Sequence, residues 1–201
     1  PQMRKRVFFV GLRDSHEDFK FPEPTVGKND YVTCEEAIGD LPSLQTDEGD
    51  IIYGEEIQDY LYPIQNDYQK RMRANSEKVR NHIGSIPIEK TKFMISLVPE
   101  GKNYKALPEE YQGIYKYHEA LTRYHSKKPS NTINTGHRSH FHYKWNRIPT
   151  VRESARLQSF PDDFIFYGNK SEQYRQVGNA VPPILGQVVA DALLPYLKDG
   201  E

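Results

Sequence analysis

The sequence predicts a mixed α/β fold, with strands and helices arranged as in an α+β protein. Residues 2–12 alternate in polarity and then become continuously apolar, a pattern typical of a β-strand. Thr-x-x-Glu sequences at 33–36 and 150–153 have the spacing of capping boxes and predict two helix starts. An apolar stripe that follows Pro183 predicts a C-terminal helix.

The predicted N-terminal strand has two parts. Gln2, Arg4 and Arg6 share one face, because successive side chains of an extended chain point to opposite sides. The apolar run at residues 7–10 is typical of a strand buried on both faces. Residues 14–30 are rich in Pro, Gly and Asn and are expected to form a loop.

Two helices are expected next. The first should begin after Thr33 and end at Gly39 and Pro42, which interrupt helical periodicity. Asp67 is expected to cap a second helix that runs through residues 72–79.

The middle of the chain is less regular. Residues 86–99 and 101–108 favour short strands and turns. Residues 111–124 fit a helix by apolar spacing and a strand by tyrosine content, so both remain open. Residues 131–136 and 141–145 are expected to be strands of a small sheet.

Two helices are expected near the C-terminal end. The helix opened by Thr150 must stop before Pro161, because proline disfavours helix at the preceding residue. The last helix begins with Pro183 and carries an apolar stripe, which must pack against a core. The stripe consists of Leu185, Val188, Val189, Ala192, Leu193 and Tyr196.

Composition restricts the class of protein. Of 201 residues, 36% are hydrophobic and the mean hydropathy is −0.80, so we expect another segment or chain to complete part of the apolar surface. The single cysteine excludes an internal disulfide, and no apolar run approaches the roughly 20 residues of a membrane span. With no signal-peptide pattern, a reducing, cytoplasmic location is expected.

The charges are distributed unevenly. A net charge of −1 argues against a general nucleic-acid binder. Residues 29–69 nevertheless hold eleven Asp or Glu and no Lys or Arg, whereas residues 120–152 hold seven Lys or Arg, four His and no acid. Two interpretations remain open: one face for DNA and one directed away from it, or two solvated charge runs.

Three motifs carry a specific resemblance. Residues 150–162 read Thr-Val-Arg-Glu-Ser-Ala-Arg-Leu-Gln-Ser-Phe-Pro-Asp, and residues 174–183 read Tyr-Arg-Gln-Val-Gly-Asn-Ala-Val-Pro-Pro. They resemble the two closing motifs of the cytosine-C5 DNA methyltransferases. Residues 2–6 resemble the family's earlier Gln-x-Arg-x-Arg motif, and residues 33–42 resemble the segment directly after that motif in many members.

The resemblance implies a place within the enzyme. The family's Gly-rich cofactor loop, Pro-Cys nucleophile and Glu-Asn-Val acid precede Gln-x-Arg-x-Arg, and this chain begins after them. We therefore expect the C-terminal part of a bacterial-type methyltransferase, inactive alone. Residues 1–45 would end a Rossmann-like catalytic domain, 46–165 would form an irregular target recognition domain, and 166–201 would hold the closing motif and a returning helix.

The same resemblance implies a cofactor and partners. S-adenosylmethionine would donate the methyl group, mostly from a pocket outside this chain. Double-stranded DNA and the N-terminal catalytic half of the enzyme would be the partners. The alternative is a DNA-binding specificity or regulatory module without catalysis of its own.

Five residues are expected at the active site by resemblance. Arg6 matches the arginine at O2 of the flipped cytosine, a contact that suits a permanently charged, planar guanidinium. Arg4 matches the arginine that braces the nucleophile loop, and Gln2 matches the motif's glutamine. Asn179 and Ala180 match the corner that faces the methionine end of the cofactor, Ala180 through its main chain only.

The expected DNA contacts lie in residues 120–152, which we call the basic segment. Thr132 and Ile133 resemble the Thr-Leu or Thr-Ile pair of the recognition region, and the polar residues around them either read DNA or form ordinary turns. Arg123, Arg138 and Lys144 are expected to contact phosphates.

Arg152, Glu153 and Arg156 occupy positions i, i+1 and i+4 of the helix that begins at Thr150. In the family this helix braces the recognition region. We therefore expect these side chains to form a buried or half-buried ion pair rather than a reactive group.

Cysteine and histidine are two further residue types that could take part in catalysis or metal binding. Cys34 is not expected to be the nucleophile, because it lies in the first turn of a helix beside two carboxylates that oppose a thiolate. His137, His140 and His142 have no cysteine nearby to complete four zinc ligands. Phosphate contact or surface placement is expected for them instead, and no metal site.

Overall fold

The computed structural model describes residues 1–13, 18–46, 50–115, 119–136 and 139–197. The helices are α1 (Cys34–Ile38), α2 (Asp67–Arg73), α3 (Glu89–Ser96), α4 (Val151–Leu157), α5 (Lys170–Asn179) and α6 (Pro183–Leu197). The strands are β1 (Ile57–Gln58), β2 (Val79–Arg80), β3 (Thr122–Arg123) and β4 (His140–Phe141), and 3-10 turns lie at Tyr104–Ala106 (η1) and Glu109–Tyr111 (η2). β1 pairs antiparallel with β2, and β3 pairs parallel with β4. The predicted mixed α/β class is confirmed.

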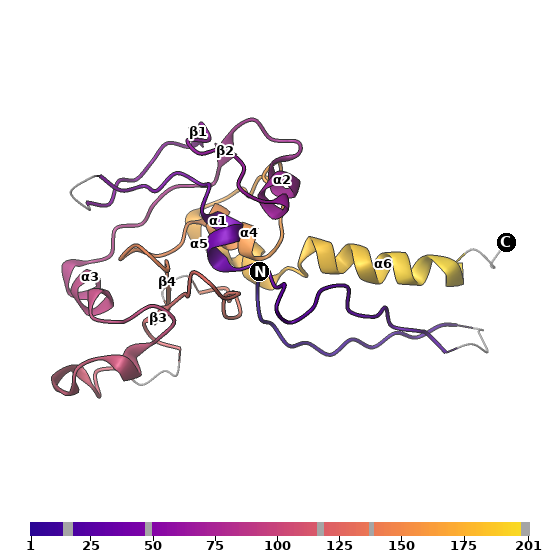
Figure 1. The fold of residues 1–201 in the computed structure, drawn as a ribbon, viewed down its shortest axis with the longest axis horizontal. Helices are drawn as coiled ribbons and strands as arrows, with labels where there is room; N and C mark the ends of the chain where they lie inside the picture. The colour runs from indigo at the N-terminus through magenta and orange to yellow at the C-terminus, as the bar shows by residue number, and fades with distance from the viewer. Residues whose placement is uncertain (14–17, 47–49, 116–118, 137–138, 198–201) are drawn as a thin grey trace.

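The molecule has a body and an arm. In Figure 1, α1 to α5 and both sheets form the body, while α6 projects from it beside the indigo N-terminal segment. The Lys20 amide donates to the Tyr196 hydroxyl at 3.2 Å, and the rings of Phe19 and Tyr196 lie 5.6 Å apart. No residue of α6 is buried. The predicted apolar stripe is therefore only partly covered, by this segment.

The strand predicted for residues 2–12 is not formed. Gln2 makes an isolated parallel bridge with Ser130, and the following residues extend into the arm without strand structure. Val7 and Phe9 are 78% and 93% exposed. A strand needs hydrogen-bonding neighbours along its edges, and within the described ranges only Gln2 has one.

Both predicted capping boxes are present. The Thr33 hydroxyl accepts from the Glu36 amide at 3.3 Å, and the Glu36 carboxylate accepts from the Thr33 amide at 2.8 Å. Thr150 and Glu153 repeat this arrangement at the start of α4. A third box, formed by Asn169 with the acid three residues later, opens α5, which was not predicted although its Asn-x-x-Glu spacing is visible in the sequence.

Several predictions for the middle of the chain were wrong. Asn66, not Asp67, caps α2, and the helix ends at Arg73, so Val79 lies in β2. Residues 86–99 contain helix α3 rather than short strands. The helix brings Met94 and Ile95 into a core with Phe141, which shows that tertiary packing decided this segment.

The small sheet differs from the one expected. Of residues 111–124, the end forms β3, which favours the strand interpretation there. β3 pairs with His140 and Phe141 rather than with 131–136, which have no strand. The two short sheets serve mainly to fix loops.

The body contains two cores. The larger joins α1, α4 and α5, and it includes Ile38, Val79, Leu157, Phe166 and Val177. The smaller joins α3 to the sheet of β3 and β4, and it includes Met94, Ile95, Val98, Leu107, Leu121 and Phe141.

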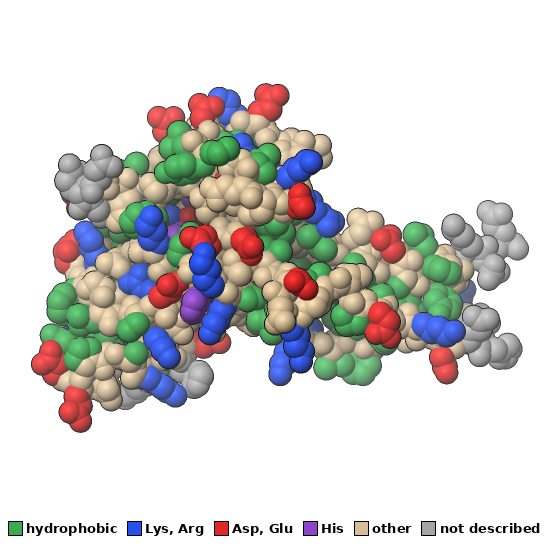
Figure 2. All heavy atoms as spheres, viewed as in Figure 1, with side chains coloured by type: hydrophobic (Ala, Val, Ile, Leu, Met, Phe, Trp, Pro, Cys, Tyr) green, Lys and Arg blue, Asp and Glu red, His purple; other side chains and the backbone are tan. Residues whose placement is uncertain are grey.

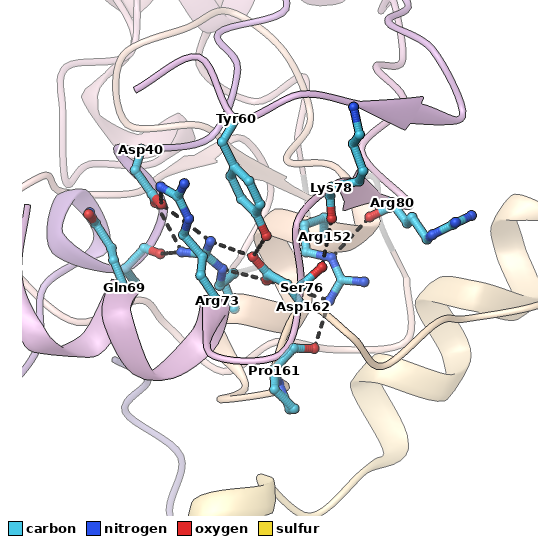
Figure 3. Close-up of polar contacts among 12 residues, drawn as sticks. Asp40, Tyr60, Gln69, Arg73, Ser76, Lys78, Arg80, Arg152, Pro161 and Asp162 are labelled. Carbon is cyan, nitrogen blue, oxygen red and sulfur yellow. Dashed lines mark hydrogen bonds and ion pairs between the residues drawn. The ribbon is translucent and has the colours of Figure 1, made fainter. Parts of the chain in front are cut away.

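A buried charge network holds α1 and α4 together. The Arg156 guanidinium donates to Asp162 through Nε and Nη2, both at 2.6 Å, and to Asp40 through Nη1 at 3.0 Å. The three side chains are fully buried. Figure 3 shows Tyr60 directed at Asp162 and Arg73 beside Asp40, so the loop that carries Tyr60 and helix α2 close over the network.

A second buried network lies at the start of α4. Arg147 binds Glu153 with both terminal nitrogens, at 2.6 and 2.7 Å. His82 Nε2 donates to the Pro42 carbonyl at 2.7 Å, which leaves Nδ1 to accept from the Thr150 hydroxyl at 2.9 Å. Burial lowers the pKa of His82 to about 4 and that of His142, which lies 3.7 Å from Glu153, to about 3. Both histidines are neutral near pH 7.

One stretch of the described chain, residues 170–197, has the length and composition of a membrane-crossing helix. The structure divides it, because α5 ends at Asn179 and α6 begins at Pro183. The 15 residues of α6 span roughly 22 Å, less than the roughly 30 Å of a bilayer's hydrocarbon core. Over the residues that the structure describes, neither helix alone reaches this length.

Replacing Arg156 with Ala is expected to lower the free energy of unfolding by about 3–5 kcal/mol, because Asp40 and Asp162 would stay buried without their counter-charge. Urea denaturation followed by circular dichroism measures this. The control is Lys78→Ala, which breaks an exposed pair with Asp59 and should change stability by less than about 1 kcal/mol. Equal losses in the two variants would show that the buried network is not the main support.

Stability is expected to fall as the pH drops from about 6.5 to about 4. Because the folded-state pKa values of His82 and His142 are lowered, the unfolded chain binds more protons in this window. Each histidine contributes a slope of about 1.4 kcal/mol per pH unit between its two pKa values. Urea denaturation from pH 4 to 8 measures how the free energy of unfolding depends on pH. His82→Asn should reduce the slope by about 1.4 kcal/mol per pH unit, the contribution of one histidine. An unchanged slope in that variant would contradict the assignment.

Candidate nucleic-acid interface and active-site edge

Hydrogen bonds join N-terminal residues 1–4 to the segment that holds Thr132 and Ile133, and we call this set of contacts the clasp. The Gln2 amide group accepts from the Ile133 N–H at 2.6 Å and donates to the Gln158 side chain at 2.7 Å. Backbone bonds of 2.8 Å join Met3 to Ser130 and Ser130 to Pro1. Residues 1–3 and 130–133 are therefore fixed against each other and against the end of α4.

Arg4 extends this clasp to helix α5. Its Nη1 donates to the Ile133 carbonyl at 3.1 Å and to the Gly178 carbonyl at 2.9 Å. A Cβ atom at Gly178 would lie 2.5 Å from the backbone of Asn134, so only glycine permits this close approach. Gln158 adds a bond of 2.6 Å to the Val177 carbonyl.

Arg6 differs from the other two residues of its motif. It is exposed, and its guanidinium donates to the neighbouring Lys5 carbonyl at 2.7 Å. Gln2 and Arg4 are thus directed at distant protein groups, whereas Arg6 is directed at solvent. This arrangement leaves Arg6 able to contact a ligand from outside the chain.

The corner at Asn179 and Ala180 lies at the end of α5, just ahead of α6. Asn179 is the last residue of α5, and the Ala180 amide donates back to Val177 at 3.4 Å. The first turn of α6 begins three residues later, so its free N–H groups do not belong to Asn179. Asn179 is exposed and lines an open hollow of about 320 Å³ with Glu172, Arg175 and Gln176.

Arg123 is not placed to contact DNA. It is 6% exposed, and its guanidinium donates to the carbonyls of Val98 at 2.9 Å and Ile95 at 2.7 Å. The expected DNA contact is therefore wrong in this structure, because Arg123 joins α3 to the small sheet. A basic residue in a polar run gives no local sign that it will be buried.

The other expected DNA contacts have mixed surroundings. Lys144 is exposed, with its ammonium 4.4 Å above the Trp145 ring. The Thr132 hydroxyl donates to the Met3 carbonyl at 3.1 Å, and Ile133 is buried. Both side chains therefore stabilise the protein's own structure. Arg138, like His137, lies outside the described residues.

His140 and His142 are buried, which corrects the expected surface placement. His140 stacks on Tyr124 with ring centroids 5.4 Å apart, and His142 Nδ1 accepts from the Lys144 amide at 3.0 Å. Burial lowers both pKa values. The position of the His140 ring is explained by its packing on Tyr124, and that of the His142 ring by the nearby Glu153 carboxylate.

Cys34 has no exposed surface. Burial raises the pKa of its thiol to about 12, so the thiolate is absent near pH 7. The sequence did not predict Cys34 as a nucleophile. Burial, rather than the adjacent carboxylates, is the main cause of the raised pKa.

Helix α4 buries all three of its charged side chains, Arg152, Glu153 and Arg156. They do not pair with one another. Arg152 donates to the carbonyls of Arg80, Pro161 and Phe164. Glu153 binds Arg147, and Arg156 binds Asp162 and Asp40. These partners were not predicted. Arg147 and Asp162 each lie six residues from the side chain that they bind, a separation that marks no pair on a helix, and Asp40 lies 116 residues from Arg156.

Gly178→Ala is expected to displace the segment at Asn134 or the end of α5, because its new Cβ atom would meet backbone that cannot rotate away. The variant should lose stability by about 1–3 kcal/mol and show altered amide NMR shifts at 131–135. Gly186→Ala is the control, since open space surrounds that helical position and alanine should stabilise it slightly. Identical behaviour of the two variants would contradict the close approach.

Comparisons with known proteins identify the family of this chain. The family model "C-5 cytosine-specific DNA methylase" matches residues 1–194. The type II methyltransferase M1.HphI of Haemophilus parahaemolyticus is 39% identical over 194 residues, covering 96% of this chain and 44% of that protein. The type II methyltransferase M.DdeI of Desulfomicrobium norvegicum is 33% identical, covering 99% and 52%.

A solved structure shares the fold. The crystal structure of a DNA modification methyltransferase encoded within an E. coli prophage superposes with a TM-score of 0.62, covering 93% of this chain and 52% of that one at 21% identity. The chain spans about half the length of these relatives. The motifs and the match along residues 1–194 place this chain in the C-5 cytosine-specific DNA methylase family.

Proposed function

We propose that this chain is the C-terminal part of a DNA cytosine-C5 methyltransferase, supplying target recognition and one edge of the active site. The clasp carries this proposal: Gln2 and Arg4 join the Thr132 segment to the closing motif, while Arg6 stays exposed beside them. A segment that reads DNA and a group that contacts the flipped base must keep a fixed separation, and the clasp provides one.

Arg6 binds the cytosine that is extruded from the duplex. Carbon 5 becomes nucleophilic when a thiolate adds to carbon 6, and negative charge then develops at O2 and N3 of the ring. The exposed guanidinium of Arg6 stabilises charge at O2 with donors that never deprotonate. Arg4 and Gln2 hold the segment that presents it.

The thiolate comes from outside this chain. Cys34 is the chain's single cysteine, and it is fully buried with a raised pKa. The proposed N-terminal catalytic half therefore supplies the nucleophile, and the chain alone transfers no methyl group.

S-adenosylmethionine supplies the methyl group. The exposed Asn179 amide, with Glu172 and Arg175 beside it, offers hydrogen-bonding and charged groups that suit the zwitterionic methionine end of the cofactor. Ala180 contributes its main chain. These residues form one wall of a pocket that the catalytic half completes.

The arm is the side that meets the catalytic half. Val7, Phe9 and Leu197 are 78%, 93% and 70% exposed, and α6 has no buried residue. Figure 2 shows hydrophobic side chains, in green, along the surface of the arm. Helix α1 instead packs on α4, so we assign residues 33–45 to the recognition body rather than to the catalytic domain. This moves the first domain boundary from residue 45 to about residue 32.

Double-stranded DNA meets the body through exposed lysines, including Lys127, Lys128 and Lys144. The proposed enzyme acts in the cytoplasm of a bacterium and modifies a specific DNA sequence. Its relatives from Haemophilus parahaemolyticus and Desulfomicrobium norvegicum are named type II methyltransferases.

Reconstitution tests the proposal. The purified chain should transfer no labelled methyl group to DNA, and adding the N-terminal half of the Haemophilus parahaemolyticus relative in trans should produce transfer. In the reconstituted enzyme, Arg6→Ala should lower turnover at least tens-fold with little change in DNA affinity, because its contact strengthens in the transition state. Lys5→Ala, at the adjacent exposed position, is the control. Transfer by the chain alone would refute the division of labour, and DNA binding without any restored transfer would favour the non-catalytic module.

A further inference from the structure

An open hollow of about 470 Å³ lies beside the small sheet, between the turn after α3 and the Thr132 segment. Its lining includes Lys102, Lys105, Glu119, Thr122 and Asn131. The motifs and the clasp use none of these side chains. In Figure 1 the turn and strand β3 lie at the lower left of the body, far from the arm.

The walls of the hollow are fixed by the backbone. The Tyr104 amide donates to the Ala120 carbonyl at 3.2 Å, and the Arg123 amide donates to the Lys102 carbonyl at 2.9 Å. Asn131 follows Ser130, whose amide and carbonyl both bond to the N-terminal residues. The backbone positions from which the lining side chains extend are therefore fixed relative to one another, which favours recognition of a rigid ligand.

The exposed groups form a mixed donor and acceptor set. Lys102 and Lys105 carry ammonium donors, and Glu119 carries a carboxylate acceptor. In the major groove, guanine presents two acceptors, O6 and N7, and its paired cytosine presents the N4 amino donor. Lysine is a suitable donor to the guanine acceptors, and glutamate is a suitable acceptor for the cytosine amino group.

Two buried polar atoms belong to residues next to those that line the hollow. Ser130 Oγ and His140 Nε2 are buried without a hydrogen-bond partner among the described residues. Ser130 precedes Asn131, and His140 pairs with Thr122 across β3 and β4, so both adjoin lining residues. Both atoms are shielded from solvent, so the base contacts depend on the exposed side chains of the lining.

We infer that this hollow reads a G·C base pair of the DNA target from the major groove, with Glu119 accepting from cytosine and Lys102 or Lys105 donating to guanine. This inference rests on the proposed function, which makes DNA the ligand, and it adds the residues that determine one position of the recognition sequence. Asn131 is exposed and also lines the hollow, so its amide is available for an adjacent base or phosphate.

The test is selection of bound duplexes from a randomised DNA library by the full chain, followed by sequencing. The parent chain should enrich a motif that contains a fixed G·C pair in addition to the pair that holds the target cytosine. Glu119→Gln should relax one G·C position by about five- to a hundred-fold, with adenine admitted, because glutamine can bind the adenine edge. Glu109→Gln, at an exposed acid on the neighbouring turn η2, is the control and should leave the motif unchanged.

A second pair of variants separates base reading from phosphate attraction. Replacing Lys102 and Lys105 with Ala should relax the same position that Glu119→Gln relaxes. Replacing Lys90 and Lys92 of α3 with Ala should at most weaken binding uniformly across sequences. A motif that neither Glu119→Gln nor the Lys102/Lys105 variant changes would overturn the hollow's role and leave the proposed function standing. Failure of the chain to bind any duplex would contradict the proposed function itself.

Discussion

The body depends on one buried cation, the guanidinium of Arg156, placed between the carboxylates of Asp40 and Asp162. Each of these charges alone would be strongly unfavourable in an interior without water, so the three are stable only together. Arg73 and Arg152 approach the same two carboxylates, at 3.2 and 3.8 Å, and offset their excess negative charge. The arginines come from α2 and α4, and the carboxylates come from the segments that follow α1 and α4, so the network also specifies how these helices meet.

That arrangement extends from the core to the functional edge through the end of α4. Gln158 follows the last residue of the helix and bonds to both Gln2 and the Val177 carbonyl. The Thr132 segment and the closing motif are therefore positioned by a helix whose own place is fixed by buried charges. Replacing Arg156 should therefore displace the clasp residues even though none of them is changed.

The sequence predicted features that depend on local physics. The capping boxes at Thr33 and Thr150 needed only four neighbouring residues, and they formed as predicted. The features that it did not predict depend on contacts between distant segments. Arg123 finds carbonyls at the end of α3, His82 finds Pro42, and the expected strand at residues 2–12 finds a partner only at Gln2. No spacing rule encodes such partners, because folding brings them together from separate parts of the chain.

The same distinction changes how the basic segment should be understood. Arg123, Arg147 and Arg152 account for three of its seven Lys and Arg residues, and all three are buried as structural cations. Lys127 is exposed but pairs with Glu35. A DNA surface built from the remaining charges has modest electrostatic attraction, so selective binding requires base-edge contacts in addition to phosphate neutralisation. Lys102, Lys105 and Glu119, which lie outside the basic segment, are well placed to provide them because the small sheet and the turn after α3 bring them to one hollow.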